Sequence, residues 1–145
     1  IIEVIGKVLA LNGEPVAGAR IELWQANAAG RYAHPSDNNR AAPLDPHFQG
    51  FAKLVTDRNG GYRYKTIKPG AYPDGDAAPR PPHIHLDVIG KKNRIITQMI
   101  FPGETLNESD DVLAHLDRSR LTARNEGKSA DGVQRFQWDI ILLNG

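Results

Sequence analysis

Hydrophobic residues recur along the chain in short runs rich in valine, isoleucine, leucine and aromatic side chains, and clusters of Gly, Pro, Asn and Asp separate these runs. This pattern is typical of short strands joined by turns and loops. Strands are predicted at residues 2–11, 19–26, 51–56, 62–66, 83–89, 94–101 and 135–143. The pattern favours an all-β fold, an antiparallel β-sandwich of about seven to eight strands with long loops and one short helix.

The predicted helix lies within residues 108–119. In this stretch Val112, Leu113 and Leu116 share one face at helical spacing. Ser109 precedes them and belongs to the residue types that cap helix N-termini. We expect this helix to pack on the sandwich or to form the wall of a pocket.

Two Asn-Gly pairs, Asn12-Gly13 and Asn59-Gly60, lie between hydrophobic runs. Asn-Gly favours the positive φ angles that tight turns require. We therefore expect the chain to reverse its direction at both places.

Two long segments, residues 27–49 and 68–82, are rich in Pro, Ala and Asp and too long to be simple turns. Loops of this length on a rigid scaffold are where functional sites are usually built. A length of 145 residues fits one domain, residues 1–145, with a single core. Because Ile1 already starts a predicted strand, we expect upstream sequence, which leaves a removed export signal open.

The composition excludes several classes of function. Charges of both signs are interspersed, the net charge is +1, and no basic run suggests nucleic-acid binding. No hydrophobic run approaches the roughly 20 residues that a membrane span needs, so we expect a soluble, cytoplasmic protein. Cysteine is absent, so any metal must be bound by histidine, carboxylate or tyrosinate.

Two of the five histidines, His83 and His85, are separated by a single residue in a predicted strand. Side chains at positions i and i+2 of a strand point to the same side, so both imidazoles face one way while Ile84 and Leu86 face the other. Such a pair can chelate a metal ion. The same spacing also suits two histidines that merely line a half-buried strand, and spacing alone does not decide.

Tyrosines offer further ligands. Tyr32 and Tyr72 lie in the two long loops, whereas Tyr62 and Tyr64 alternate in a predicted strand and are expected to pack on the core. Because a phenol has a pKa near 10, tyrosinate ligation needs a strongly polarising cation, and ferric iron is the common one. Two tyrosinates and one hydroxide would balance the three charges of Fe(III), which permits a buried site.

Several ordered motifs resemble one known family. They cover residues 6 to about 101, and they are GKV, GEPVAGARIELWQANAAGRYAHPSD, LDPHFQGF, TDRNGGYRYKTIKPGAYP, RPPHIHL and TQMIF. Together they resemble the intradiol ring-cleavage dioxygenases, most of all the metal-binding chain of the protocatechuate 3,4-dioxygenases. The later run RFQWDIILL is similar to the closing strand of that family.

The resemblance implies a non-haem Fe(III) bound by Tyr32, Tyr72, His83 and His85, with Tyr72 and His85 axial and a hydroxide as the fifth ligand. It also implies a catecholic substrate that is cleaved with O2 between the two hydroxylated carbons to a cis,cis-muconate-type diacid. In this family the axial tyrosinate, here Tyr72, leaves the metal when the catechol binds and takes up a proton.

The resemblance further places Arg80 beside the bound catecholate, where a guanidinium can stabilise negative charge on the ring. Gln98 matches a polar residue behind the metal ligands, although a strand glutamine can equally bond a loop backbone. The remaining histidines are expected to have structural or supporting roles, and three large aromatic residues are expected to pack. These residues are His34, His47 and His115, and Trp24, Trp138 and Phe48.

The choice of catechol is open. The short spacing from Tyr72 to His83 is similar to that of protocatechuate enzymes. However, Asp74 occupies a position where those enzymes commonly carry tryptophan, and Asp76 follows it. An acidic loop could disfavour a carboxylate-bearing substrate. A homo-oligomer and a different partner subunit are both compatible with the sequence.

Two other interpretations remain. GKVLALNGEPVAGARIEL followed by TDRNGGYRY also resembles non-catalytic transthyretin-like β-sandwich binding modules, which lack the tyrosine and histidine motifs. A different HxH metalloprotein, such as a cupin-type Fe(II) or zinc enzyme, would use histidine or carboxylate as its third ligand. The metal content and colour of the protein separate these interpretations.

Overall fold

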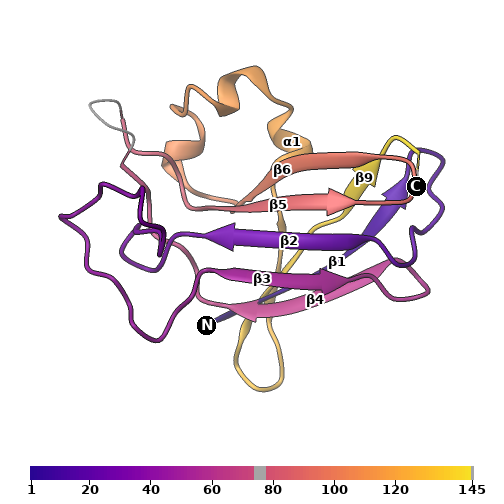
Figure 1. Cartoon of the computed structure of the whole chain (residues 1–145), viewed down its shortest axis with the longest axis horizontal. Coiled ribbons are helices and arrows are strands. Elements are labelled where there is room, and N and C mark those ends of the chain that lie inside the picture. Colours follow the sequence, from indigo (N-terminus) through magenta and orange to yellow (C-terminus); the bar gives the residue numbers. More distant parts are fainter. Residues whose placement is uncertain (74–77, 145) are drawn as a thin grey trace.

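The computed structural model describes residues 1–73 and 78–144, and this part of the chain forms two β-sheets packed face to face (Figure 1). The strands are β1 (Ile2–Ala10), β2 (Arg20–Gln25), β3 (Phe51–Val55), β4 (Gly61–Thr66), β5 (His83–Ile89), β6 (Arg94–Ile100), β7 (Arg124–Lys128), β8 (Gln134–Gln137) and β9 (Ile140–Leu142). Helical segments are the 3-10 turns Thr105–Asn107 and Leu113–His115 and the helix α1 (Arg118–Leu121). The expected all-β sandwich is confirmed. Within the described residues, none of the helices has the length and hydrophobicity that crossing a membrane requires.

One sheet has the strand order β4-β1-β8-β7, with β9 also paired to β1, and the other has the order β3-β2-β5-β6. The pairing is antiparallel except that β8 and β9 both run parallel to β1. The single strand predicted at residues 135–143 is therefore two strands. They separate at Trp138, whose backbone approaches β1 so closely that a Cβ on Gly6 would lie 1.8 Å from the Trp138 carbonyl oxygen.

Strand β7 was not predicted. Its sequence is RNEGK, and every residue in it is exposed, so it carries no alternation of hydrophobic and polar positions. Among the described residues it pairs with β8 alone, at the edge of the sheet, with an irregularity in register between Asn125 and Lys128. An edge strand that buries nothing leaves no hydrophobic signal in the sequence.

The helix predicted within residues 108–119 is wrong as a single element. A 3-10 turn ends at Leu116, where the backbone is extended, and α1 begins only after Asp117. Ser109 does not cap this segment, since its hydroxyl donates to the Leu106 carbonyl. Instead Asp117 accepts a hydrogen bond from Ser119 N at 3.1 Å and caps α1, because a carboxylate competes well for free backbone N–H groups.

Both predicted turns are present. Gly13 and Gly60 have φ angles of +87° and +73°, in the region where glycine is favoured. The second turn is stabilised by Asp57, whose Oδ1 accepts from Asn59 N and Gly61 N, both at 2.8 Å. This turn joins β3 in one sheet to β4 in the other, so it carries the chain across the sandwich.

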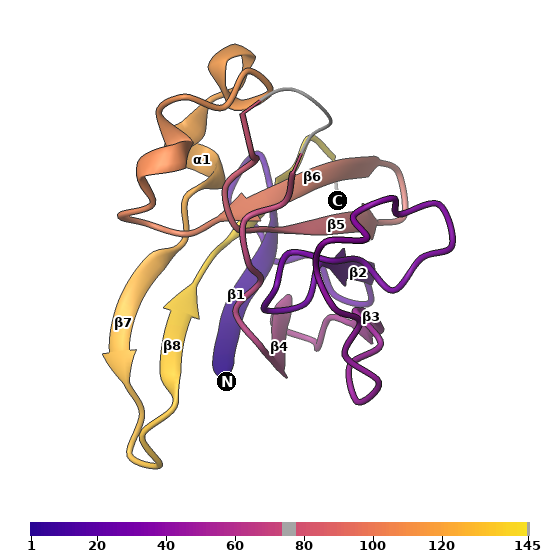
Figure 2. The same cartoon turned by 90° about the vertical axis from the view of Figure 1, so that its left-hand side faces the viewer.

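The core lies between the sheets, and it determines which way β5 faces. Ile84, Leu86 and Val88 of β5 are fully buried in it, so the alternate residues face the outer side of the sheet. Tyr62 and Tyr64 are buried in the same core, as predicted. The long loop between β2 and β3 and the described parts of the segment between β4 and β5, residues 67–73 and 78–82, lie at one end of the sandwich (Figure 2).

Candidate metal centre

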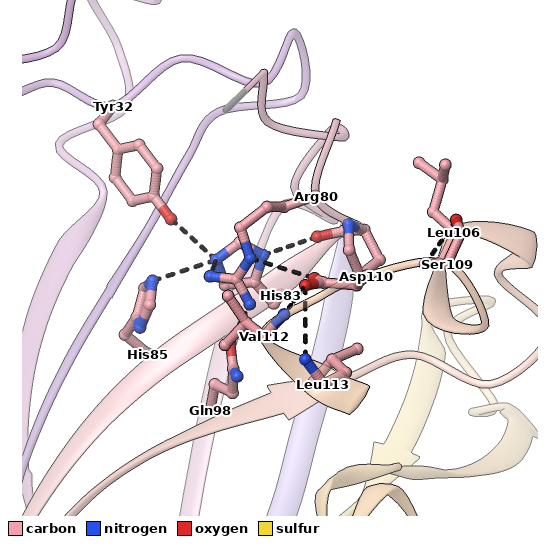
Figure 3. A network of polar contacts seen from close by, with 11 residues as sticks. Tyr32, Arg80, His83, His85, Gln98, Leu106, Ser109, Asp110, Val112 and Leu113 are labelled. Atoms are coloured by element: carbon pink, nitrogen blue, oxygen red, sulfur yellow. Dashed lines mark hydrogen bonds and ion pairs between the residues drawn. The ribbon is translucent and has the colours of Figure 1, made fainter. Parts of the chain in front are cut away.

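The two histidines of β5 face outward at the end of the strand nearest these loops. His83 is 3% exposed and His85 is half-buried, and their Nε2 atoms lie 3.1 Å apart. The hydroxyl of Tyr32 lies 3.3 Å from His83 Nε2, so three donor atoms from two segments converge (Figure 3). The predicted chelating pair and the first predicted tyrosine are therefore brought together.

The loop that carries Tyr32 packs tightly against the loop that carries Tyr72. Gly30 has a φ of +79°, and a Cβ there would lie 2.0 Å from the Ala71 carbonyl oxygen. Only glycine fits this approach without displacing the neighbouring loop. The rings of Tyr32 and Tyr72 consequently meet edge to face with centroids 4.9 Å apart.

Asn27 holds the two loops together, and the sequence analysis did not identify it. Its side chain is buried, and its Oδ1 accepts from Ala29 N and Arg31 N, which shapes the loop before Tyr32. Its backbone oxygen accepts from Gly70 N at 2.9 Å, two residues before Tyr72. The clue in the sequence is an asparagine at the end of a strand, a residue type that bonds nearby backbone.

Both histidines are neutral at pH 7. Burial is the main cause that lowers the pKa of His83 to about 4 and that of His85 to about 3, and the Arg80 charge lowers both further. His83 Nδ1 lies 2.6 Å from the Pro81 carbonyl, so Nδ1–H donates to it and Nε2 keeps its lone pair. The imidazoles are thus prepared to donate to a metal ion.

The donor set fits a ferric ion better than other metals. Two ligands about 2.1 Å from one ion at a right angle lie about 3 Å apart, which matches the 3.1 Å and 3.3 Å separations. In the described part of the chain, no three His, Asp or Glu side chains converge, and Tyr32 supplies the third donor atom beside the two histidines. Burial raises the pKa of Tyr32 to about 12, and a strongly polarising cation is required to ionise it.

Arg80 lies beside the donor atoms. Its backbone pairs with that of Tyr72, with Tyr72 N donating to the Arg80 carbonyl at 3.0 Å and Arg80 N donating back at 2.7 Å. Its Nη1 donates to His83 Nε2 at 3.3 Å and its Nη2 to Gln98 Oε1 at 2.8 Å. The backbone bridge therefore brings the second tyrosine and the arginine to one place, and Gln98 contacts Arg80 rather than a loop backbone.

Two further residues of the site were missed. Trp24, expected only to pack, lies on the outer face and stacks on His85, with ring centroids 5.1 Å apart and planes 9° apart. Asp110 accepts a hydrogen bond from Arg80 Nε at 3.1 Å. Side chains alternate along β2, so a buried Leu23 could have predicted that Trp24 points to the outer face. No local sequence pattern predicts that Asp110 contacts Arg80.

The other three histidines do not join the converging donor atoms, although His34 lines a cavity together with Tyr32 and Tyr72. His34, His47 and His115 are exposed, and His34 Nδ1 bonds to Ser36. Asp74 and Asp76 lie outside the described residues.

An open cleft of about 950 Å³ borders the site. Arg80, His85 and Gln98 lie along it, and it continues past the exposed side chains of Ile96 and Leu116. Its size is ample for a single aromatic ring. A small ligand in this cleft would meet His85 and the Arg80 guanidinium together.

Comparisons with known proteins agree with this architecture. Residues 1–144 match a family model described as Dioxygenase. The chain is 47% identical over 154 residues to the protocatechuate 3,4-dioxygenase beta chain of Burkholderia cepacia, covering 97% of this chain and 63% of that one. It is 31% identical to catechol 1,2-dioxygenase of Candida albicans, covering 94% of this chain and 49% of that protein.

A solved structure shows the same fold. It is the dioxygenase domain of a dioxygenase carbohydrate-binding protein fusion from Streptomyces sp. SirexAA-E. The TM-score is 0.75 at 26% identity, with 99% of this chain and 80% of that chain covered. The present chain therefore spans less than two thirds of the two curated relatives named above, but most of this solved domain.

Proposed function

The chain belongs to the intradiol dioxygenase family, and from this premise we propose that it cleaves a catechol with O2 between its two hydroxylated carbons. Both oxygen atoms enter the product, a cis,cis-muconate-type diacid, so no external reductant is needed. The observation that carries the proposal is the convergence of His83 Nε2, His85 Nε2 and Tyr32 Oη beside the Arg80 guanidinium.

We propose that Tyr32, Tyr72, His83 and His85 hold Fe(III). When bound, this ion would act as a Lewis acid that binds both catechol oxygens and makes the ring reactive toward O2. The Pro81 carbonyl keeps the Nε2 lone pair of His83 available for the metal.

The proton chemistry falls to the tyrosines. A catechol must lose both phenolic protons to bind as a dianion, and the site needs a base that can take one of them. We assign this role to the Oη of Tyr72, because the backbone of Tyr72 is paired with that of Arg80 and its ring meets Tyr32. Its proton uptake, with the second proton taken by a hydroxide that leaves as water, would keep the charge of the site unchanged on substrate binding.

Arg80 would supply positive charge to the site, and Trp24 would orient the ring of His85. The Arg80 side chain is 13% exposed, so its positive charge acts through a medium that screens it less than water does. A fixed guanidinium in that position stabilises negative charge as it develops on the substrate. Trp24 stacks on His85 and limits the rotation of that ring.

For the substrate we propose only the chemical class, an aromatic ring with two adjacent hydroxyl groups. Relatives are named for protocatechuate and for catechol, and both compounds carry the adjacent hydroxyls that the site would bind. Because one relative is named a beta chain and is longer than this chain, we propose that a second copy or a different subunit completes the pocket. Size-exclusion chromatography with light scattering would show whether the chain assembles with itself.

The visible absorption spectrum of the purified protein tests this proposal. A tyrosinate-to-Fe(III) band that shifts to longer wavelength on anaerobic addition of catechol or protocatechuate is the expected result, and the larger shift ranks the substrates. Tyr32→Phe should lose the band. Tyr64→Phe is the matched control, because it removes a buried hydroxyl that has no hydrogen-bond partner among the described residues. A colourless protein after ferric reconstitution would favour the binding module instead.

A further inference from the structure

Asp110 reaches the candidate metal centre from the segment that follows β6, outside every motif that pointed to the site. Its side chain is 2% exposed, and its two oxygens serve different partners. Oδ1 accepts from Val112 N at 2.8 Å and from Leu113 N at 3.4 Å, which anchors the carboxylate to the start of a 3-10 turn. Oδ2 accepts from Arg80 Nε at 3.1 Å (Figure 3).

Each nitrogen of the Arg80 guanidinium consequently has its own partner. Nε donates to Asp110 and Nη2 donates to Gln98 Oε1 at 2.8 Å, so acceptors from two separate segments hold two sides of the group. Nη1 is left facing His83 Nε2, at 3.3 Å. Because a guanidinium is planar and rigid, fixing two of its nitrogens fixes the direction of the third.

We propose that Asp110 is the positioning residue of this site: it holds Arg80 so that Nη1 faces the point where the histidine nitrogens converge. The inference deepens the proposed function, because the oxygen of a bound catecholate would lie next to that point, within reach of the guanidinium. An arginine side chain has several rotatable bonds, and an unanchored guanidinium would have to be ordered again in each turnover. The carboxylate also compensates the charge of a largely buried arginine.

The competing interpretation is that Asp110 only stabilises the turn at Val112 and Leu113. Two substitutions separate the roles. Asp110→Asn keeps one oxygen for the turn but places an amide NH2, which cannot accept, toward Arg80 Nε. Asp110→Ser can still cap the turn and is too short to reach Arg80, so it replaces the first variant if that one does not fold. Asp111→Asn is the matched control, because it makes the same charge change on the neighbouring exposed residue.

The first experiment needs neither metal nor turnover. In the metal-free protein, the Nε–H signal of Arg80 is observed by nitrogen-15 NMR and assigned through its loss in Arg80→Lys. In Asp110→Asn we expect its hydrogen exchange to become at least about tenfold faster, while the amides of Val112 and Leu113 keep their exchange rates. An unchanged Arg80 signal in Asp110→Asn would overturn the proposal, whatever reaction the protein catalyses.

The second experiment uses the iron-loaded enzyme. Asp110→Asn should lower kcat by roughly 10- to 100-fold and change KM by less than about threefold, with Asp111→Asn at the wild-type rate. In an Arg80→Ala background, Asp110→Asn should change kcat by less than about twofold, since its effect acts through Arg80. An equal loss in both backgrounds would show a purely structural role. If the wild type has no turnover, the proposed function fails and the NMR result alone decides the positioning.

Discussion

Among the buried carboxylates of the described residues, Glu3 and Asp110 both bind arginine, but with different consequences. Glu3 of β1 is 1% exposed, and its two oxygens are taken by Arg63 of β4 and Arg135 of β8, the latter at 2.7 Å. Asp110 is equally buried but gives one oxygen to a backbone turn and the other to Arg80. The first cluster ties three strands together, and the second extends through its arginine to Gln98 and His83.

The two clusters differ in the groups that their arginine side chains contact and in how exposed those side chains are. The Arg63 side chain is 63% exposed and ends at Glu3, so this cluster can contribute only to the stability of the sheet. The Arg80 side chain is 13% exposed and continues to the converging donor atoms. The same ion-pair chemistry therefore becomes functional only when its cation is directed into a site. Substitutions at each cluster should separate activity from stability.

The largest effect is expected from removing His83, whose Nε2 faces the Arg80 guanidinium. His83→Ala deletes one of the converging nitrogens, so bound iron, the visible band and turnover should all be lost. Iron content and the absorption spectrum are measured after ferric reconstitution. His47→Ala, at an exposed histidine that is not among the converging residues, should behave like the wild type. A coloured, active His83→Ala would contradict the ligand assignment.

Arg80→Ala should have the next largest effect. The donor atoms remain, so iron and colour are expected to persist while kcat falls by about 10²- to 10³-fold. Steady-state kinetics are compared at a temperature where both proteins are folded. Arg63→Ala removes an arginine from the Glu3 cluster and should leave kcat unchanged. If both variants lose turnover equally, the distinction between the clusters is wrong.

Glu3→Gln should change stability and its dependence on pH but not activity. Hydrogen bonds and charge from Arg135 and Arg63 hold the pKa of Glu3 below its usual value of 4.5. The carboxylate therefore stabilises the fold above pH 4.5, and this contribution is lost as the pH falls through the lowered pKa. Urea unfolding between pH 3 and pH 7 should show a shallower acid loss in Glu3→Gln. Parallel curves for both proteins would show that Glu3 is not responsible.

The smallest effect is expected at a third carboxylate–arginine pair, Asp87 with Arg94, on the outer face of the β5–β6 pair. Arg94 makes two hydrogen bonds to Asp87, at 2.9 Å and 2.6 Å, but its side chain is 60% exposed. Water and salt screen such a pair, so Arg94→Ala should lower the unfolding midpoint least. The loss should shrink further in high salt. A larger loss than that of Glu3→Gln would mean that burial does not rank these pairs.

Local sequence patterns were sufficient for much of the fold. Six of the seven predicted strands correspond to single strands, because hydrophobic alternation reports directly which face of a strand is buried. The same alternation placed His83 and His85 on one side of β5. Strand β7 and the break at Trp138 could not be predicted, since the first buries nothing and the second depends on the approach of Gly6 from a distant strand.

For the candidate site, the sequence by itself determined the chemical inventory: no cysteine, two loop tyrosines and an HxH strand, which limit the metal that could be bound. The tertiary structure decided the arrangement around it. Trp24 stacks on His85 because β2 pairs with β5, and Asp110 meets Arg80 because the chain returns to the site after β6. Residue type and spacing specify chemistry and local direction, whereas contacts between distant segments depend on how the whole chain packs.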